Sequence, residues 1–183
     1  MLVGNVLSAW LVINIIIVVI LTLLFTYFIC LLIDVIIVLR YISKIRKNDS
    51  ALCVLYTAKL DIYSGICEIL IKDGYEVDQN LVKTLNYIDT EDFANQNSVV
   101  CDESKDKLTY VGDRILLAVT SNDKYRDDLV ISGYLNSIAE YDANIKNAEM
   151  LYNVDAQGYN YWINIPPFRF IHKIFKQKEK KTI

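Results

Sequence analysis

The sequence predicts an all-α protein in which one N-terminal transmembrane helix is followed by an antiparallel helical bundle. A long uncharged apolar run lies near the N-terminus, and later apolar residues recur at steps of three and four without the alternation of a β-strand. The chain has 183 residues, of which 54% are hydrophobic, with only two prolines and six glycines. This composition excludes a disordered, collagen-like or linker-dominated chain.

The apolar run covers residues 15–33 and contains no charged residue. At about 1.5 Å per helical residue, such a run matches a hydrocarbon core of about 30 Å. Trp10 and Tyr41 bracket it, as the aromatic residues of the two membrane interfaces do. We therefore predict a short extracytoplasmic N-terminus at residues 1–10 and a transmembrane helix at residues 11–39.

Charge is distributed unevenly and predicts the orientation in the membrane. Asp34 is the only charged residue before Arg40, and we favour an interfacial or helix-packing role for it over a functional carboxylate within the membrane. Residues 40–47 carry four basic residues, whereas residues 48–167 have 20 Asp and Glu against nine Lys and Arg, a net charge of −11. The positive-inside rule then predicts a single-pass protein of the cell (cytoplasmic) membrane, with its N-terminus outside and its body in the cytoplasm. In that reducing compartment the cysteines should be free thiols.

The body, residues 50–167, is predicted to be the cytoplasmic helical bundle. The acidic, amide-rich run at residues 89–107 has no helical periodicity and is expected to be a loop. Most of the 13 tyrosines lie on apolar stripes, and the acidic body repels phosphate, so core packing is favoured over nucleic-acid binding. The expected helices cover the stretch from Ser50 to Gly74, a short segment after Asp78, residues 108–119, and a long helix from Asp127 to Tyr161 ended by Pro166 and Pro167.

The last segment, residues 168–183, is predicted to be a basic amphipathic tail. As a helix it would place Phe168, Ile171 and Phe175 on one face. Contact with an anionic membrane surface is one interpretation, and a solvated bundle helix or an electrostatic contact with the acidic body are the alternatives. The candidates for membrane-surface contact are Arg169, Lys173, Lys176 and Lys180.

Two Tyr-Asn pairs near the C-terminal end resemble a motif of the LemA family. Tyr152-Asn153 and Tyr159-Asn160 are separated by five residues and are followed by Ile163 and Pro166. Upstream, residues 75–82, which include Tyr75 and Asn80, resemble the family's YDLIPNLV stretch, and residues 115–119 resemble its LLAL helix. The resemblance implies a membrane-anchored bacterial protein with one N-terminal span and a helical bundle, and it implies no reaction.

The chain departs from the family pattern at several positions. Asp73-Gly74 stands where the family has two arginines, Gln79 replaces its proline, Glu149 replaces an arginine, and Ile165 replaces the phenylalanine before Pro166. For the Tyr-Asn pairs we favour structural bracing, in which Asn holds the neighbouring helix by side-chain hydrogen bonds, over a ligand or partner site. Their spacing of seven places the tyrosines on one helix face and the asparagines on the adjoining one.

The residues argue against catalysis. The only histidine, His172, lies in the basic tail, and the sequence has no ExxH pair, glycine-rich phosphate loop or GxSxG motif. We expect no enzyme, cofactor or metal site, and no nucleic-acid partner. A non-catalytic interaction or scaffold module with an unidentified protein partner is the favoured function. A homo-oligomeric membrane assembly organised through the span is the alternative, weakened because the span has no GxxxG motif.

Overall fold

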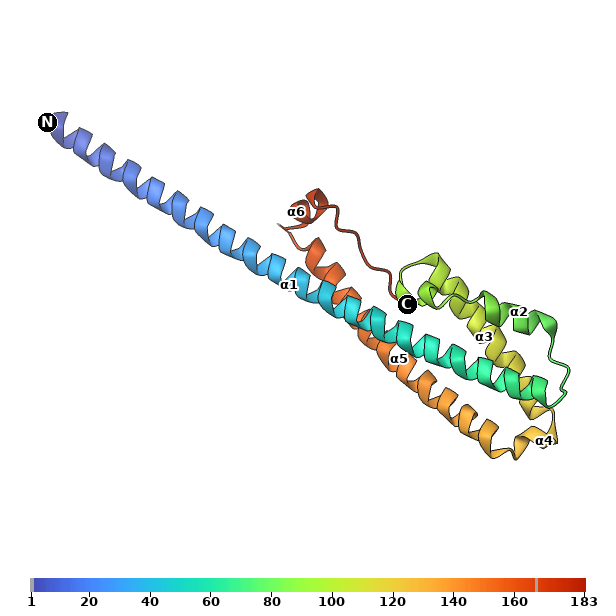
Figure 1. Cartoon of the computed structure of the whole chain (residues 1–183). Helices are drawn as coiled ribbons and strands as arrows, with labels where there is room; N and C mark the ends of the chain where they lie inside the picture. Colours follow the sequence, from blue (N-terminus) through green and yellow to red (C-terminus); the bar gives the residue numbers. More distant parts are fainter. Residues whose placement is uncertain (1, 167) are drawn as a thin grey trace.

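A computed structural model describes the backbone of residues 2–166 and 168–183, and the side chains of residues 10–166 and 168–183. The predicted N-terminal segment, residues 1–10, lies almost wholly outside the described side chains, as does Pro167. The all-helical class is confirmed, since the described residues form helices and no strand (Figure 1). The elements are α1 Leu2–Lys72, α2 Gln79–Tyr87, the 3-10 helix η1 Thr90–Ala94, α3 Val99–Thr120, α4 Asp123–Arg126, α5 Leu129–Asn164 and α6 Arg169–Ile174.

Helix α1 is continuous for 71 residues, so the helix predicted from Ser50 to Gly74 is observed as its C-terminal part, and its continuity with the apolar run was not predicted. The segment that joins the apolar run to the body contains no glycine or proline, and its arginines and lysines are good helix formers. Val38, Ile45 and Leu52 are all buried, and their heptad spacing carries the core stripe through the junction. The predicted span and the first helix of the body are therefore one element.

The end of α1 follows the sequence prediction at Gly74. Gly74 has a φ of 78°, a left-handed conformation that glycine adopts without steric cost. Its N–H donates to the carbonyl of Ile71, and the N–H of Tyr75 donates to that of Leu70, each at 3.0 Å. These two bonds form a Schellman motif, which turns the chain toward α2.

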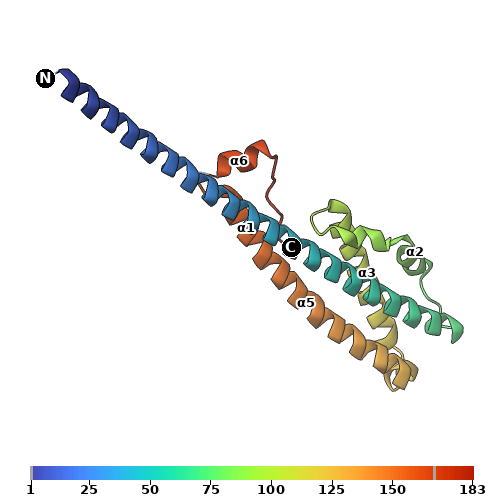
Figure 2. The same ribbon diagram turned by 60° about the vertical axis from the view of Figure 1, so that its left-hand side comes forward.

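Helices α1 and α5 lie side by side and run in opposite directions (Figures 1 and 2). Starting from the end of the body nearest the apolar run, Asn48 Nδ2 donates to Asp155, Tyr56 Oη donates to Glu149, and Lys59 Nζ pairs with Asp142. Partners on α5 descend in number as those on α1 ascend, so the order is antiparallel. The predicted long last helix, from about Asp127 to Tyr161, is observed as α5.

The third side of the body is formed by α3 with η1 and α2, which corrects the predicted loop at residues 89–107. Ser98 caps α3 by accepting a hydrogen bond from the N–H of Cys101, so the helix begins nine residues before the predicted start at Leu108. Phe93 of η1 is fully buried and stacks on Tyr56 with ring centroids 5.1 Å apart. Burial of Cys101, Ser104 and Phe93 stabilises this region although its sequence is acidic and aperiodic.

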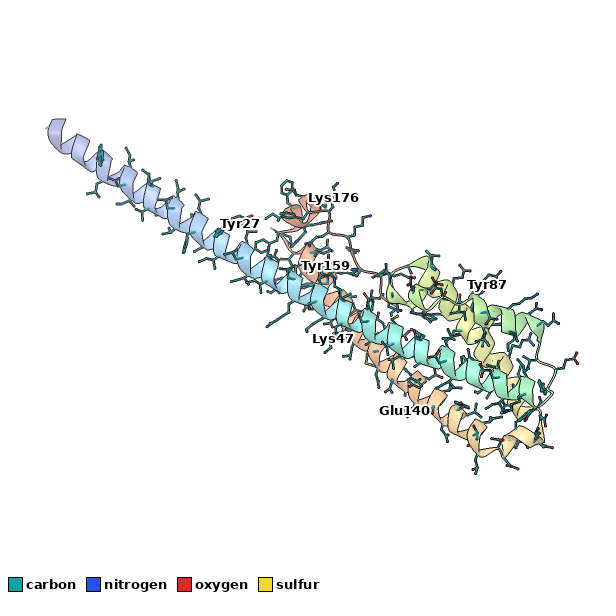
Figure 3. The ribbon with its side chains drawn as sticks, in the orientation of Figure 1. Tyr27, Lys47, Tyr87, Glu140, Tyr159 and Lys176 are labelled. Carbon is teal, nitrogen blue, oxygen red and sulfur yellow. The ribbon has the colours of Figure 1, made fainter. Side chains whose placement is uncertain are left out.

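The N-terminal half of α1 extends away from the body (Figures 1 and 3). An 18-residue window of this helix has a mean hydropathy of 3.1 and none of it is buried. Among the described residues this is the one helix long and apolar enough to cross a membrane.

Gly112 of α3 lies against the side chain of Tyr63 of α1 and carries a testable prediction. A Cβ at Gly112 would overlap the hydroxyl of Tyr63 and lie 2.9 Å from its Cζ, and the Tyr63 side chain is buried. Gly112→Ala is therefore expected to lower the denaturation midpoint by forcing the two helices apart. The matched control is Gly133→Ala in α5, where a Cβ meets nothing within 4 Å and the gain in helix propensity should leave stability equal or higher. A lower midpoint in both variants, or in neither, would contradict the packing argument.

Candidate functional site

The C-terminal tail returns along the body in an extended conformation instead of continuing as a helix. Helix α6 ends at Ile174, and Lys176 has a φ of 53°. The N–H of Lys176 donates to the carbonyl of Lys173, and the N–H of Gln177 donates to that of His172, which closes the helix with a Schellman motif. The prediction of one amphipathic helix over residues 168–183 is therefore wrong beyond Ile174. Residues 177–183 contain no helical residue and lie beside α5 and α3 (Figure 1).

Asn153 and Asn160 of α5 hold the tail by side-chain amides that pair with its backbone. Asn160 Oδ1 accepts from the N–H of Lys180 at 2.7 Å, and Asn160 Nδ2 donates to the carbonyl of the same residue at 2.8 Å. Asn153 makes the same two bonds with Ile183, whose N–H lies 2.8 Å from Asn153 Oδ1. Each amide thus satisfies both polar groups of one tail residue, as a neighbouring β-strand would.

The spacing of the two asparagines matches the repeat of an extended chain. Seven residues of α-helix rise by about 10.5 Å, and three residues of extended chain span about 10 Å. Asn153 and Asn160 are seven residues apart on one helix face, and their partners Lys180 and Ile183 are three residues apart. The numbers run in opposite order, so the tail is antiparallel to α5.

Further polar contacts attach the tail to η1 and α3. Asn97, in the turn before α3, accepts from the N–H of Lys181 at 2.9 Å. The Lys181 ammonium pairs with Asp102 of α3, which holds the pKa of that carboxyl below its usual range. At the start of the segment Asn164 Nδ2 donates to Glu179 at 2.8 Å. Residues 179–183 therefore lie between α5 and the start of α3, and we call the surface that they cover the tail groove.

The floor of the tail groove contains polar groups with little access to water. Tyr152 is fully buried, and burial together with the neighbouring Asp49 carboxylate raises the pKa of its hydroxyl to about 12. Burial also raises the pKa of Asp49, with Lys180 of the tail opposing that change. Asp49 is a residue of α1, so an acidic group from a third element faces the basic tail.

A second buried contact joins the predicted span to α6. Asp34 is 2% exposed and His172 is 4% exposed, and His172 Nε2 lies 2.9 Å from Asp34 Oδ2. The approach is off the axis of a good hydrogen bond, and the contact is an ion pair when the imidazole is protonated. Phe168 stacks on Tyr27 of α1, with ring centroids 6.4 Å apart. Helix α6 therefore lies against α1 at the level of Tyr27 to Asp34.

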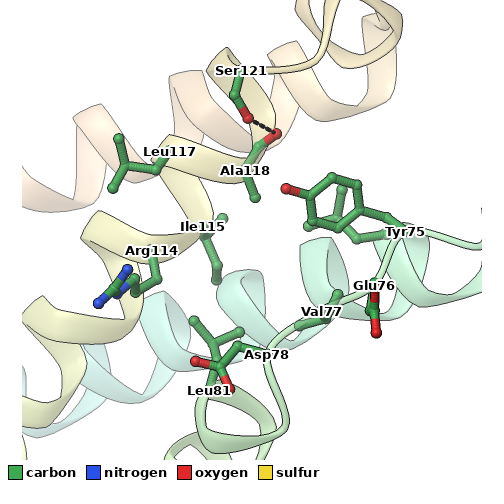
Figure 4. Close-up of a pocket in the computed structure, with 11 residues that line it drawn as sticks. Tyr75, Glu76, Val77, Asp78, Leu81, Arg114, Ile115, Leu117, Ala118 and Ser121 are labelled. Carbon is green, nitrogen blue, oxygen red and sulfur yellow. Dashed lines mark hydrogen bonds between the residues drawn. The ribbon is translucent and has the colours of Figure 1, made fainter.

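The two upstream motif segments meet at a hollow of about 270 Å³ near the far end of the body (Figure 4). Tyr75, Val77 and Asp78 line it from the connection before α2, and Ile115 and Ala118 line it from α3. Its rim carries both charge signs, since Glu76, Asp78 and Arg114 lie around it. Asp78 caps α2 by accepting a hydrogen bond from the N–H of Asn80 at 2.9 Å, so that carboxylate serves the fold.

The structure gives each predicted motif residue a location. Tyr152 and Tyr159 are buried in the core, and Asn153 and Asn160 contact the tail and not a neighbouring helix. Tyr75 lies edge-on to Tyr125 with ring centroids 6.1 Å apart. The remaining motif residues, Asn80 at the start of α2 and Pro166 after α5, are exposed.

The four candidates for membrane-surface contact are divided by the end of α6. Arg169 and Lys173 lie on the helix and Lys176 follows it, and all three are exposed. Lys180 is half-buried in the tail groove, where its backbone pairs with Asn160. The face that was predicted to unite the four residues is therefore not formed.

Sequence reasoning missed the partners of these residues. Asn97, Asp49 and the pairing of Asp34 with His172 were not predicted, because each contact joins elements distant in sequence. One signal was present: the span carries one charged residue and the chain carries one histidine. A buried carboxylate needs a partner that can donate a hydrogen bond or carry a positive charge, and histidine can do both.

Among the described side chains, no cluster of three or more His, Cys, Asp or Glu residues is arranged to hold a metal ion. Cys67 is buried, and burial raises the pKa of its thiol to about 11, which keeps it protonated at neutral pH. Cys101 is buried as well, and its thiol lies 3.4 Å from Gln96 Oε1. These thiols therefore pack as core groups.

Comparison with protein-family models, with curated proteins and with solved structures found no match for the chain. The resemblance to LemA proteins thus rests on the motifs of the sequence.

Proposed function

We propose that the chain is a single-pass, non-catalytic interaction or scaffold module of the LemA type, held at the cytoplasmic face of the membrane. One observation supports this proposal above the others: the bare apolar segment and the packed body share the continuous helix α1. A rigid connection of this kind holds the body at a set distance from the bilayer. Helices α1 and α5 contact each other in antiparallel order, and α3 packs against α1. These contacts support a helical bundle as the module.

The orientation is the first part of this proposal to test. Arg40, Lys44, Arg46 and Lys47 are exposed on α1 directly after the apolar segment, where the positive-inside rule applies. A thiol reagent that cannot cross membranes is expected to label Ser8→Cys in intact cells and to leave Ser50→Cys unlabelled until the cells are opened. Cys101 is buried and would remain unlabelled in either orientation, so the exposed Ser50 is the better reporter. Labelling of Ser50→Cys alone in intact cells would reverse the proposed topology.

Helix α6 is the second part of the proposal, as a contact with the membrane surface. If Trp10 marks the outer interface, a hydrocarbon core of about 20 residues ends near Cys30. Helix α6 packs beside α1 at this level, with the side chains of Phe170, Ile174 and Phe175 between 60% and 71% exposed. Exposed basic residues flank them, as in a helix that lies in the interface.

If α6 contacts lipid, fluorescence quenching by lipid should differ between two neighbouring positions of the chain. A fluorophore on Phe175→Cys should be quenched by doxyl-labelled lipid in nanodiscs that contain anionic lipid, whereas one on Lys178→Cys should not. Lys178 is exposed and follows the turn at Lys176 that directs the tail toward the body, which makes it the matched control. The exposed Cys30 and half-buried Cys53 are replaced by serine in both proteins. Equal quenching at the two positions would contradict the proposed contact of α6 with the membrane surface.

A further inference from the structure

The tail groove recognises its occupant mainly through the backbone. Five hydrogen bonds join the asparagine side chains of the groove to backbone groups of Lys180, Lys181 and Ile183. Recognition through main-chain N–H and C=O groups provides affinity for any extended segment, and side-chain pockets add specificity. A surface of this kind is not restricted to a segment of its own chain.

The side chains of the tail define what else the groove selects. Lys181 pairs with Asp102. The charge of Lys180 opposes the rise that burial causes in the pKa of Asp49, so two consecutive positions favour basic residues. Ile183 is half-buried and packs against the core, whereas Thr182 is exposed. The groove therefore fits an extended sequence of two basic residues, one unrestricted residue and one apolar residue.

We propose that the tail groove is a binding site for an extended basic segment of a partner protein, and that residues 179–183 occupy it in cis. A partner segment with the basic-basic-any-apolar pattern competes with the tail for Asn97, Asn153 and Asn160. The connection to α5 gives the tail an effective concentration in the millimolar range, so the intact chain binds a free segment weakly until the tail is displaced. The inference identifies a binding surface for the interaction module proposed above, and it depends on the groove contacts and not on the membrane topology.

The test uses the full-length chain in detergent and a fluorescent peptide with the sequence of residues 177–183. Lys180→Pro/Ile183→Pro removes the two N–H groups that pair with Asn160 and Asn153, which should empty the groove. The peptide is expected to bind this variant at least tenfold more tightly than the unaltered chain. Adding Asn153→Ala/Asn160→Ala to the variant should abolish saturable binding. If the proline variant does not fold, a chain ending at Gln177 serves as the acceptor.

Methylated peptides distinguish backbone recognition from simple charge attraction. N-methylation at the position of Lys180 or of Ile183 should weaken binding at least tenfold, because each N–H donates to an asparagine. N-methylation at the position of Thr182, an exposed residue outside these asparagine pairs, is the matched control and should leave binding unchanged. No saturable binding to the emptied groove, equal binding to the unaltered chain, or an equal loss from all three methylations would overturn the proposal. None of these results would alter the thiol-labelling result, so a failure here is separable from a failure of the proposed topology.

Discussion

Replacing Ile145 by alanine is expected to lower the free energy of unfolding of the body by about 2–4 kcal/mol. Ile145 lies in the middle of α5, is 7% exposed and belongs to the core. The cost arises because the lost atoms leave a cavity that neighbouring helices fill only in part. A small domain has a total stability of about 5–15 kcal/mol, so this loss is a large share.

Two neighbouring substitutions on α5 calibrate this prediction. Ile138 is half-buried, so Ile138→Ala should cost less than Ile145→Ala, a distinction that the apolar spacing alone does not make. Val154 is 62% exposed, and Val154→Ala should leave the denaturation midpoint nearly unchanged. Chemical denaturation followed by circular dichroism measures all three variants. An equal loss of stability in the Ile145→Ala and Val154→Ala variants would mean that α5 does not pack with Ile145 toward the core and Val154 toward solvent.

Replacing His172 by alanine is expected to release α6 from α1. Removing one partner of a buried polar contact leaves the other group buried without compensation, which typically costs about 1–3 kcal/mol and more for a charged group. Here the remaining group is Asp34, which is 2% exposed and has no hydrogen-bond partner for either carboxylate oxygen, so its contact with His172 is its one close polar contact in the described structure. The release should appear as faster tryptic cleavage after Arg169 and Lys173, measured by mass spectrometry on the detergent-solubilised chain.

A double variant separates loss of the partner from loss of packing. Asp34→Leu/His172→Leu removes both polar groups and keeps apolar volume, so the slow cleavage of the unaltered chain should be largely restored. Asp34→Leu alone leaves the imidazole of His172 without its carboxylate and should increase cleavage. If His172→Ala leaves the cleavage rate unchanged, the contact with Asp34 does not hold α6.

The sequence by itself determined the features that depend on local pattern. Hydropathy located the apolar segment, Gly74 predicted the end of α1, and the apolar stripe with the following proline predicted α5 to within a few residues. These features depend on neighbouring residues along the chain, where helix propensity, glycine conformation and proline geometry act directly. The helical start of α3 was missed because its stabilisation comes from the burial of Phe93 and Cys101 against other elements.

Only the tertiary structure decided which distant polar groups meet. The asparagines of the Tyr-Asn pairs were expected to brace a helix, but they pair with a tail that begins after α6 has turned the chain back along the body. The charge pattern of the tail has helical spacing and favours a helical interpretation, with an electrostatic contact to the acidic body as an alternative. The extended conformation is stabilised by Asn153 and Asn160, whose amides satisfy backbone groups of the tail. Helical spacing in one segment contains no information about hydrogen-bond partners on another. The same reason applies to Asp34 and His172. They are far apart in sequence, so local pattern does not predict that Asp34 Oδ2 and His172 Nε2 lie 2.9 Å apart.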